Sequence, residues 1–264
     1  MREILEYPRP KEETKDRKFV EALARGLDVL RAFSQKDGVL GNQDIAAITG
    51  LPKPTVSRLT YTLTKLGYLS YSTRLEKYQL DSGVLALGNA YTKSLRVRQV
   101  AKPHIEEMAK RTKVSVGLAT REGMSMIFLE FCRGDETVSM RMDIGDRVPM
   151  ATSSSGRAFL AAVIPEERDI LMKVLEERAG DEWPALSEGI DKAIANYQEK
   201  GFTTSFGEWD RSMNTVAVPI RLQDGKIVCL SCGGPSYLLS PEHMEEVLAP
   251  QLVHLGRNIA SARI

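Results

Sequence analysis

The sequence predicts an α+β protein of two domains that are joined by a linker helix. Apolar residues recur at helical spacing through the first part of the chain, whereas beyond residue 114 they often alternate with polar residues, as in strands. Charge is also divided unevenly: residues 1–80 contain 14 lysines and arginines against 10 acids, and the rest contains 22 against 25. The near-neutral net charge of the whole chain therefore combines a basic N-terminal part with an acidic remainder.

The predicted boundaries follow these changes of pattern. We expect a mobile N-terminal arm over residues 1–18, which are mostly charged, and a first domain over residues 19–80. The linker helix is expected over residues 81–93 and the second domain over residues 94–264. The sequence shows no run of about 18 apolar residues and no apolar N-terminal leader, which favours a cytoplasmic protein without a membrane segment.

The first domain is expected to contain three helices. The first runs from Phe19 to Phe33 and repeats apolar residues at helical spacing, namely Leu23, Leu27, Leu30 and Phe33. A short helix over residues 42–50 is expected to begin with Asn42 as its N-cap and to end at Gly50. After a tight turn, a third helix is expected from Pro54 to Gly67. Its buried stripe is predicted to be Val56, Leu59, Leu63 and Leu66.

The second and third helices form a helix-turn-helix, and a hairpin follows them. Tyr68–Tyr71 and Lys77–Leu80 alternate apolar and polar residues around a polar turn, which predicts a winged domain. Residues 50–80 carry five basic side chains and one acid, a balance that suits a phosphate backbone. We therefore expect double-stranded DNA as a partner. The residues expected to contact it are Lys53, Pro54, Thr55, Ser57, Arg58, Tyr61, Lys65, Arg74 and Lys77.

Within this set, the residues on the polar side of the third helix are expected nearest to the bases: Ser57, Arg58 and Tyr61. Lys53, Thr55, Lys65, Arg74 and Lys77 are expected mostly to contact phosphates and to fix the register, and Pro54 lies beside the polar face at the helix start. Two alternatives compete with this interpretation. One is an ordinary three-helix bundle with a hairpin, and the other is a winged domain that contacts protein and not DNA.

The second domain is predicted to be an antiparallel sheet enclosed by helices. The linker helix before it is expected to start at Asp81 or Ser82, and a long helix with Pro103 as a kink or as its true start follows over residues 97–112. Further helices are expected near residues 166–177 and 189–199 and after Ser240. Strands are expected over residues 114–120, 124–131, 137–142, 201–206, 214–222 and 226–233.

The chain also resembles the IclR-type bacterial transcriptional regulators, over roughly residues 19–262. The resemblance starts at Phe19–Phe33, continues through Leu51–Leu69 and recurs in the second half. It implies a ligand-responsive DNA-binding regulator, with a second domain similar to small-molecule-sensing GAF domains. It further implies a homodimer on a palindromic operator, often assembled into a tetramer, and the control of a catabolic operon. In that family the first helix also helps two DNA-binding domains to contact each other.

A small-molecule site is predicted just before a helix that is expected to begin near Arg157. Hydroxyls and free N–H groups at a helix start can bind an anion such as a carboxylate, although ordinary capping is the alternative. The resemblance implies that this loop lines the effector pocket. Its residues are Thr152, Ser153, Ser154, Ser155 and Gly156.

The second predicted pocket segment spans residues 201–220. The family often has an acidic run here, of which this chain keeps only Glu208, and Thr215 stands where a cysteine is common. Phe206 and Trp209 are expected to line the pocket, with core or interface positions as the alternative. The predicted effector is a small organic acid or an aromatic metabolite, bound in a pocket whose polarity differs from that of relatives.

Catalysis is not expected. The sequence contains no G-x-S-x-G elbow, Walker loop, G-x-G-x-x-G or H-E-x-x-H motif, so a small hydrolase or transferase is the weaker alternative. Cys229 and Cys232 form a C-x-x-C pair, but no second pair exists and positions i and i+3 of a strand face opposite sides. We predict buried thiols, no metal site and no cofactor.

Overall fold

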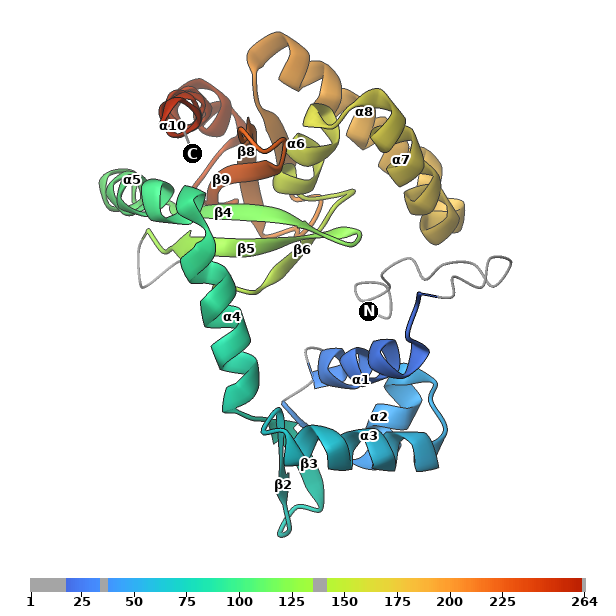
Figure 1. The fold of residues 1–264 in the computed structure, drawn as a ribbon. Coiled ribbons are helices and arrows are strands. Elements are labelled where there is room, and N and C mark those ends of the chain that lie inside the picture. The colour runs from blue at the N-terminus through green and yellow to red at the C-terminus, as the bar shows by residue number, and fades with distance from the viewer. Residues whose placement is uncertain (1–17, 34–37, 135–141, 263–264) are drawn as a thin grey trace. The chain divides into compact units, whose positions relative to one another are not determined.

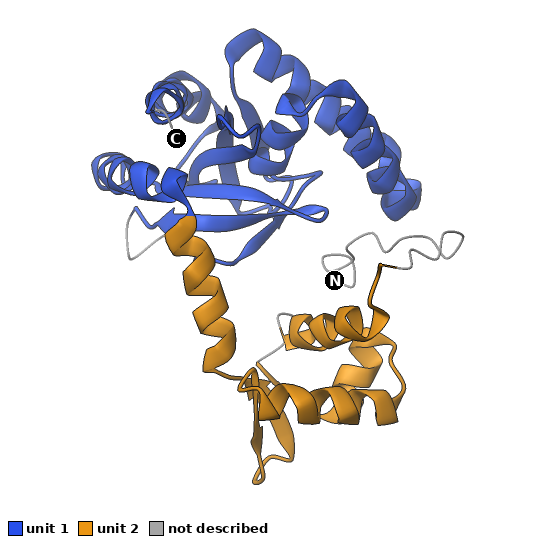
Figure 2. Ribbon diagram, in the orientation of Figure 1, with its two compact units in different colours: residues 1–7, 95–264 blue, residues 8–94 orange. Residues whose placement is uncertain are grey.

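The computed structural model describes residues 18–33, 38–134 and 142–262, which form two compact units (Figures 1 and 2). One unit ends at Ser94 and the other begins at Leu95. The predicted arm lies outside the described residues apart from Lys18, and so does the predicted strand 137–142 apart from Met142. Within the described ranges, no helix has the length and apolarity that a membrane span requires.

The N-terminal unit contains the three predicted helices and a small sheet. The strands are ordered β1-β3-β2 with antiparallel neighbours, and β1 was not predicted because it has only two residues. The elements are α1 (Glu21–Ala32), β1 (Val39–Leu40), α2 (Asn42–Thr49), α3 (Lys53–Lys65), β2 (Leu69–Ser72), β3 (Lys77–Leu80) and α4 (Ser82–Ser94).

Glycines end α2 and α3 as predicted. Gly50 and Gly67 have φ values of 70° and 76°, a left-handed conformation that glycine adopts without steric cost. The N-cap prediction for α2 is wrong by one residue: Gly41 is the N-cap, and its N–H donates to the Asp44 carboxylate at 3.0 Å. Asn42 is the first helical residue.

The predicted apolar stripes are only partly buried. In α1 the core residues are Val29 and Ala32, whereas Leu23 and Leu27 are exposed. In α3 the prediction for Leu66 is wrong, because its side chain lies beyond the helix end and is 64% exposed. None of the described residues of α4 is buried, and its apolar side chains face solvent in a single chain.

The C-terminal unit is built on one six-stranded antiparallel sheet with the order β6-β5-β4-β9-β8-β7. Its strands are β4 (Ser115–Glu122), β5 (Ser125–Cys132), β6 (Arg147–Pro149), β7 (Thr203–Phe206), β8 (Met213–Arg221) and β9 (Ile227–Pro235). Its helices are α5 (Arg96–Thr112), α6 (Ser154–Ala162), α7 (Pro165–Ala179), η2 (Gly180–Glu182), α8 (Trp183–Lys200), α9 (Pro241–His243), η3 (Met244–Leu248) and α10 (Ala249–Ser261).

The two faces of this sheet bury separate cores. α5, η3 and α10 pack against one face, and α6, α7 and α8 pack on the other (Figure 1). Strand residues alternate between the cores, so Cys229 contributes to the second and Cys232 to the first. The prediction that these two thiols are buried on opposite faces is therefore confirmed.

Several predicted boundaries move when the packing is known. The helix expected near Arg157 begins at Ser154, with Ser153 as its N-cap, and the helix expected at residue 189 begins at Trp183. α5 begins at Arg96, so Pro103 lies inside it and does not mark its start. The turn expected at residues 121–123 falls at Gly123 and the residue after it, because β4 runs on to Glu122.

Candidate functional site

The polar face of α3 is the candidate nucleic-acid surface. The side chains of Ser57, Arg58, Tyr61 and Lys65 are all exposed, with Tyr61 at 64%. The Lys65 ammonium lies 5.5 Å from the centre of the Tyr61 ring, a cation–π distance that keeps both groups on this face. At the start of the helix, Lys53 and Pro54 are exposed and Thr55 is half-buried.

Threonines hold α3 in place from behind. Thr60 is fully buried, and its hydroxyl lies 3.4 Å from the Asn42 side-chain oxygen and donates to the Val56 carbonyl at 3.0 Å. Thr62 and Thr64 donate to carbonyls one turn earlier in the helix, at 2.9 and 2.8 Å. These hydroxyls are thus engaged within α3 itself, apart from the contact of Thr60 with Asn42 of α2, which joins the two helices.

The wing adds two basic side chains to the same unit. Arg74 is exposed in the turn between β2 and β3. Lys77 begins β3 and is half-buried, and its ammonium lies 3.9 Å from the Asp44 carboxylate, so part of its charge is offset. All nine predicted DNA contacts therefore lie on or directly beside α3 and on the hairpin, in one unit of the fold.

A small cavity of about 20 Å³ lies in the C-terminal unit between the start of α6 and the sheet. Its walls are hydroxyls on one side and aromatic rings on the other, and among the described residues no charged side chain lines it. The lining residues are Ser115, Phe128, Phe131, Val148, Ser153, Ser154, Ser155, Trp209, Thr215, Ser231 and Cys232. This volume holds about one water molecule, so a larger ligand would have to move the side chains around it.

The strand register determines which residues form the floor of the cavity. Ser115 of β4 and Thr215 of β8 are both paired with Gly233 of β9, so the two hydroxyls lie on one sheet face, two strands apart, with Gly233 between them. One step along β4, a Cβ on Gly117 would lie 2.5 Å from the Phe128 ring. Glycine at this position therefore gives the two aromatic rings room to lie against the sheet.

One buried hydroxyl in this cavity is unsatisfied. Ser153 caps α6 by accepting from the Gly156 N–H at 3.1 Å, and Ser154 donates to the Thr215 hydroxyl at 2.8 Å. The Ser115 hydroxyl, in contrast, is only 3% exposed as a residue and has no hydrogen-bond partner within the described part of the chain. A buried polar group without a partner is costly, which marks this position as a place for a ligand atom.

The two buried thiols of β9 are chemically unreactive, and that of Cys232 points to the core on the opposite sheet face from the cavity. Burial raises the pKa of Cys232 to about 12, so it carries no thiolate at neutral pH. The same desolvation raises the pKa of Cys229 further. Neither sulfur is therefore prepared for nucleophilic attack or for metal binding.

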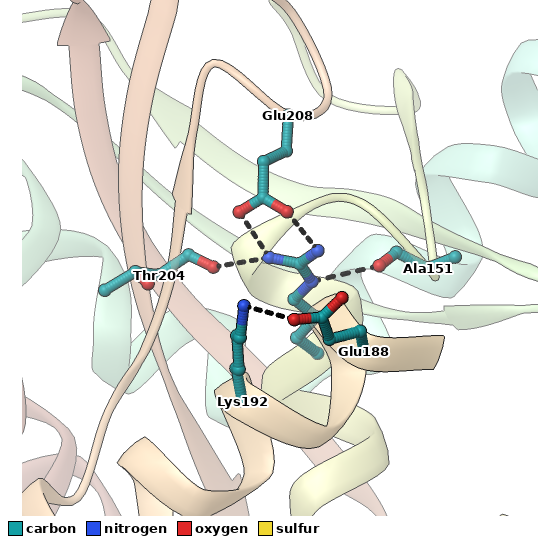
Figure 3. Close-up of polar contacts among 6 residues, drawn as sticks. Ala151, Glu188, Lys192, Thr204 and Glu208 are labelled. Atoms are coloured by element: carbon teal, nitrogen blue, oxygen red, sulfur yellow. Dashed lines mark hydrogen bonds and ion pairs between the residues drawn. The ribbon is translucent and has the colours of Figure 1, made fainter. Parts of the chain in front are cut away.

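A buried arginine fixes the loop that carries the Trp209 wall. The Arg157 guanidinium, whose side chain is 3% exposed, donates to the Ala151 carbonyl at 3.0 Å and to the Thr204 carbonyl at 3.2 Å (Figure 3). Both of its terminal nitrogens also bond the Glu208 carboxylate, one of them at 2.6 Å. Three separate segments are thus held together by one side chain.

Only some of the predicted pocket residues line the cavity. Ser153, Ser154, Ser155 and Thr215 line the cavity, whereas Thr152 and Gly156 lie next to the lining but are not part of it. Phe206 does not line it, since its ring packs against the core on the other sheet face. Glu208 is directed to Arg157 and lines a second, polar hollow, so it does not reach the cavity.

Six lining residues were missed by sequence reasoning: Ser115, Phe128, Phe131, Val148, Ser231 and Cys232. Val148 lies on β6, which was not predicted, and the other five lie on predicted strands whose neighbours cannot be read from the chain. The sequence feature that could have identified two of them is a small polar residue, Ser115 or Ser231, at a strand position that faces a buried core.

For Glu208→Gln we expect a modest loss of stability in the C-terminal unit. The amide keeps one acceptor but loses the charge and one bond to Arg157, and the Glu208 side chain is 41% exposed, which weakens the pair. The free energy of unfolding should fall by about 1 kcal/mol. Urea unfolding followed by circular dichroism measures this, with Glu188→Gln on the exposed face of α8 as a control. A loss as large as that of a fully buried pair would contradict this account.

Comparison with known proteins yields two family matches. Residues 22–72 match the IclR helix-turn-helix domain, and residues 89–261 match the domain described as bacterial transcriptional regulator IclR C-terminal. Two similar curated proteins are the HTH-type transcriptional regulator TsaQ1/TsaQ2 of Comamonas testosteroni and the Pca regulon regulatory protein of Pseudomonas putida. The first is 31% identical over 91% of this chain and 87% of its own length, the second 28% over 93% and 85%.

Solved structures give the same result. An IclR family transcriptional regulator from Brucella abortus is 44% identical, with a TM-score of 0.86 and 94% of both chains covered. An IclR homolog from Microbacterium hydrocarbonoxydans, solved in complex with 4-hydroxybenzoate, is 28% identical with a TM-score of 0.72, covering 91% of this chain and 99% of its own.

Proposed function

Since the chain belongs to the IclR family of bacterial transcriptional regulators, we propose how its two units divide that function. The protein is a DNA-binding transcriptional regulator that responds to a ligand, and it is not an enzyme. The N-terminal unit reads DNA through α3, and the C-terminal unit binds the effector in the cavity beside α6. The observation that carries the effector half is the buried, unpartnered Ser115 hydroxyl in that cavity.

On DNA, α3 enters the major groove. Ser57, Arg58 and Tyr61 are nearest to the base edges because they share its exposed face, and the guanidinium is suited to a bidentate contact with guanine. The remaining predicted contacts bind phosphates and fix the register, which makes binding sensitive to salt. They are Lys53, Thr55, Lys65, Arg74 and Lys77, whereas Pro54, which has no N–H to donate, lies beside them in the first turn of α3.

The functional form is a homodimer, or a tetramer made of such dimers, on a palindromic operator. Support comes from apolar side chains that a single chain leaves in water, including Phe19, Leu23 and Leu27 around α1. On α4, Leu85, Leu87 and Tyr91 are likewise exposed. A second copy that covered these surfaces would set two α3 helices side by side and would match a two-fold symmetric site.

The effector is a small organic acid or an aromatic metabolite, which would enter the cavity by displacing the side chains that line it. Phe128, Phe131 and Trp209 supply flat apolar walls, and the Ser115 hydroxyl and the Thr215 hydroxyl, which accepts from Ser154, supply donors for an anion. The bound 4-hydroxybenzoate of the Microbacterium relative is of this class. The regulated genes are then a catabolic operon for such a compound, and the protein works in the cytoplasm with the DNA.

For Ser115→Ala we expect weaker effector binding without a loss of stability. The change removes a hydroxyl that has no partner in the empty protein, so the free energy of unfolding should be equal or higher. Affinity for an aromatic acid should fall about fivefold to tenfold, the equivalent of one hydrogen bond. Ser153→Ala is the matched control: it removes the α6 cap and should cost about 1 kcal/mol of stability. Calorimetric titration and thermal unfolding separate the two cases.

The direct test of the whole function is a binding assay on the DNA upstream of its own gene. A complex with that duplex that weakens steeply between two salt concentrations supports the phosphate contacts, and benzoate and 4-hydroxybenzoate added to it test the effector class. If no monocyclic aromatic acid or small organic acid alters the complex or binds the protein in calorimetry, the effector assignment is wrong.

A further inference from the structure

A β-bulge connects the cavity with the helix that follows the linker. In the pairing of β4 with β5, Leu118 is opposite Glu130 but Ala119 is opposite Phe128, so Leu129 is an extra residue. Without the bulge, Phe128 and Phe131 would face opposite sides of the sheet, because they are three positions apart. With it, both rings line the cavity, at a centroid distance of 5.1 Å.

The two residues between these rings point to the other face of the sheet, where α5 lies. Leu129 joins the core around α5 and α10. The Glu130 carboxylate, 4% exposed, lies 2.9 Å from the Arg98 guanidinium and 3.7 Å from the Lys102 ammonium. Arg98 also donates to the Leu129 carbonyl at 3.0 Å. Helix α5 therefore contacts the bulge through both its backbone and its buried charge.

Arg98 belongs to the first turn of α5, and only Leu95 separates α5 from the linker helix α4 in the chain. An occupant of the cavity meets the rings of Phe128 and Phe131, which fill the space above Gly117, and the backbone between these two rings is the bulge. Moving the bulge shifts the atoms that hold Arg98. Among the described contacts, Glu130 is the only charged group between these two rings and the Arg98 guanidinium.

We propose that Glu130 is a positioning residue that couples the cavity to operator affinity, by tying the bulge between Phe128 and Phe131 to Arg98 and Lys102 of α5. This proposal rests on the proposed function, because it takes the cavity as the effector site. The coupling is a difference in free energy between two arrangements of the bulge, and it must therefore act in both directions.

A double-mutant cycle tests this coupling without any effector. Gly117→Ala places a Cβ where the Phe128 and Phe131 rings lie, at 2.5 and 2.9 Å, and so displaces them as an occupant would. We expect Gly117→Ala to change affinity for the upstream duplex by about fivefold or more. In the Glu130→Gln background the same change should alter affinity by less than about twofold. Glu130→Gln alone should stay folded and bind the duplex.

Glu106→Gln is the control for the cycle. Glu106 also lies near Lys102, at 3.7 Å, but its side chain is 55% exposed and no contact joins it to the bulge, among the residues described. In that background Gly117→Ala should keep its full effect. If Gly117→Ala is insoluble, Phe131→Leu, which shortens one of the two rings, takes its place.

Either of two results overturns the proposal: an unchanged duplex affinity in folded Gly117→Ala, or an equal effect in the wild-type and Glu130→Gln backgrounds. Failure of the proposed effector class is a separate result, since it would appear in calorimetry with aromatic acids and leave the cycle intact. A thermal midpoint alone does not report the coupling. A merely structural Glu130 would shift that midpoint without making the effect of Gly117→Ala depend on background.

Discussion

Arg58→Ala is expected to abolish selective operator binding while leaving the fold intact. The side chain is exposed on α3, so its removal creates no cavity and stability should change by less than about 0.5 kcal/mol. One bidentate contact to a base contributes about 1–3 kcal/mol of discrimination, and a dimer would lose two such contacts. Affinity for the specific duplex should therefore fall about 100-fold or more, whereas affinity for unrelated DNA should fall only slightly.

Two matched variants sharpen this test, which a competition binding assay at two salt concentrations measures. Lys53→Ala removes a predicted phosphate contact, so it should weaken specific and unrelated DNA alike and reduce the salt dependence. Lys173→Ala removes an exposed positive charge from α7, in the other unit, and should leave both affinities unchanged. If Arg58→Ala binds the specific duplex as wild type does, α3 is not the reading helix.

Arg157→Met is expected to cause the largest loss of stability among the cavity variants. The methionine fills much of the volume, but it leaves the Ala151 and Thr204 carbonyls and the Glu208 carboxylate without their donor. Two buried acceptors without partners and one broken ion pair correspond to about 2–4 kcal/mol, less than for a fully buried pair because Glu208 can rehydrate. Differential scanning calorimetry should show a melting temperature lower by roughly 5–12 °C.

The pair of variants at this site distinguishes packing from charge. Glu208→Gln leaves all three acceptors near Arg157 and should lower stability much less than Arg157→Met does. Lys192→Met, on an exposed residue of α8 that pairs only with Glu188 in the described contacts, should be neutral. A melting temperature for Arg157→Met within about 1 °C of wild type would show that the three segments do not depend on this side chain.

Local patterns were sufficient for the helix-turn-helix and for most strands. Gly50 and Gly67 end their helices because their left-handed conformation is a local property, and period-two alternation located β8 and β9 without any knowledge of the sheet. Two errors arise where the burial of a side chain depends on a packing partner that the sequence does not identify. Leu23 of α1 and Leu66 after α3 continue an apolar period, but they have nothing to pack against in the unit described.

The cavity was harder to predict because it depends on strand register. Ser153, Ser154 and Thr215 were identified, but Ser115 and Ser231 become their neighbours only through the order β4-β9-β8. Phe206 was assigned to the cavity on resemblance, yet its position on β7 turns the ring to the opposite core. The bulge at Leu129 adds a further displacement that no alternation pattern contains.

The threonines of α3 limit how many base pairs one DNA-binding domain of this protein can distinguish. Thr60, Thr62 and Thr64 use their hydroxyls on carbonyls of their own helix, so the groups left for base edges are Ser57, Arg58 and Tyr61. Three such side chains distinguish only about three or four base pairs, a word that recurs by chance every few hundred base pairs of a genome. Selection of one site in a genome must therefore depend on the second DNA-binding domain of the dimer and on the fixed spacing between the two half-sites.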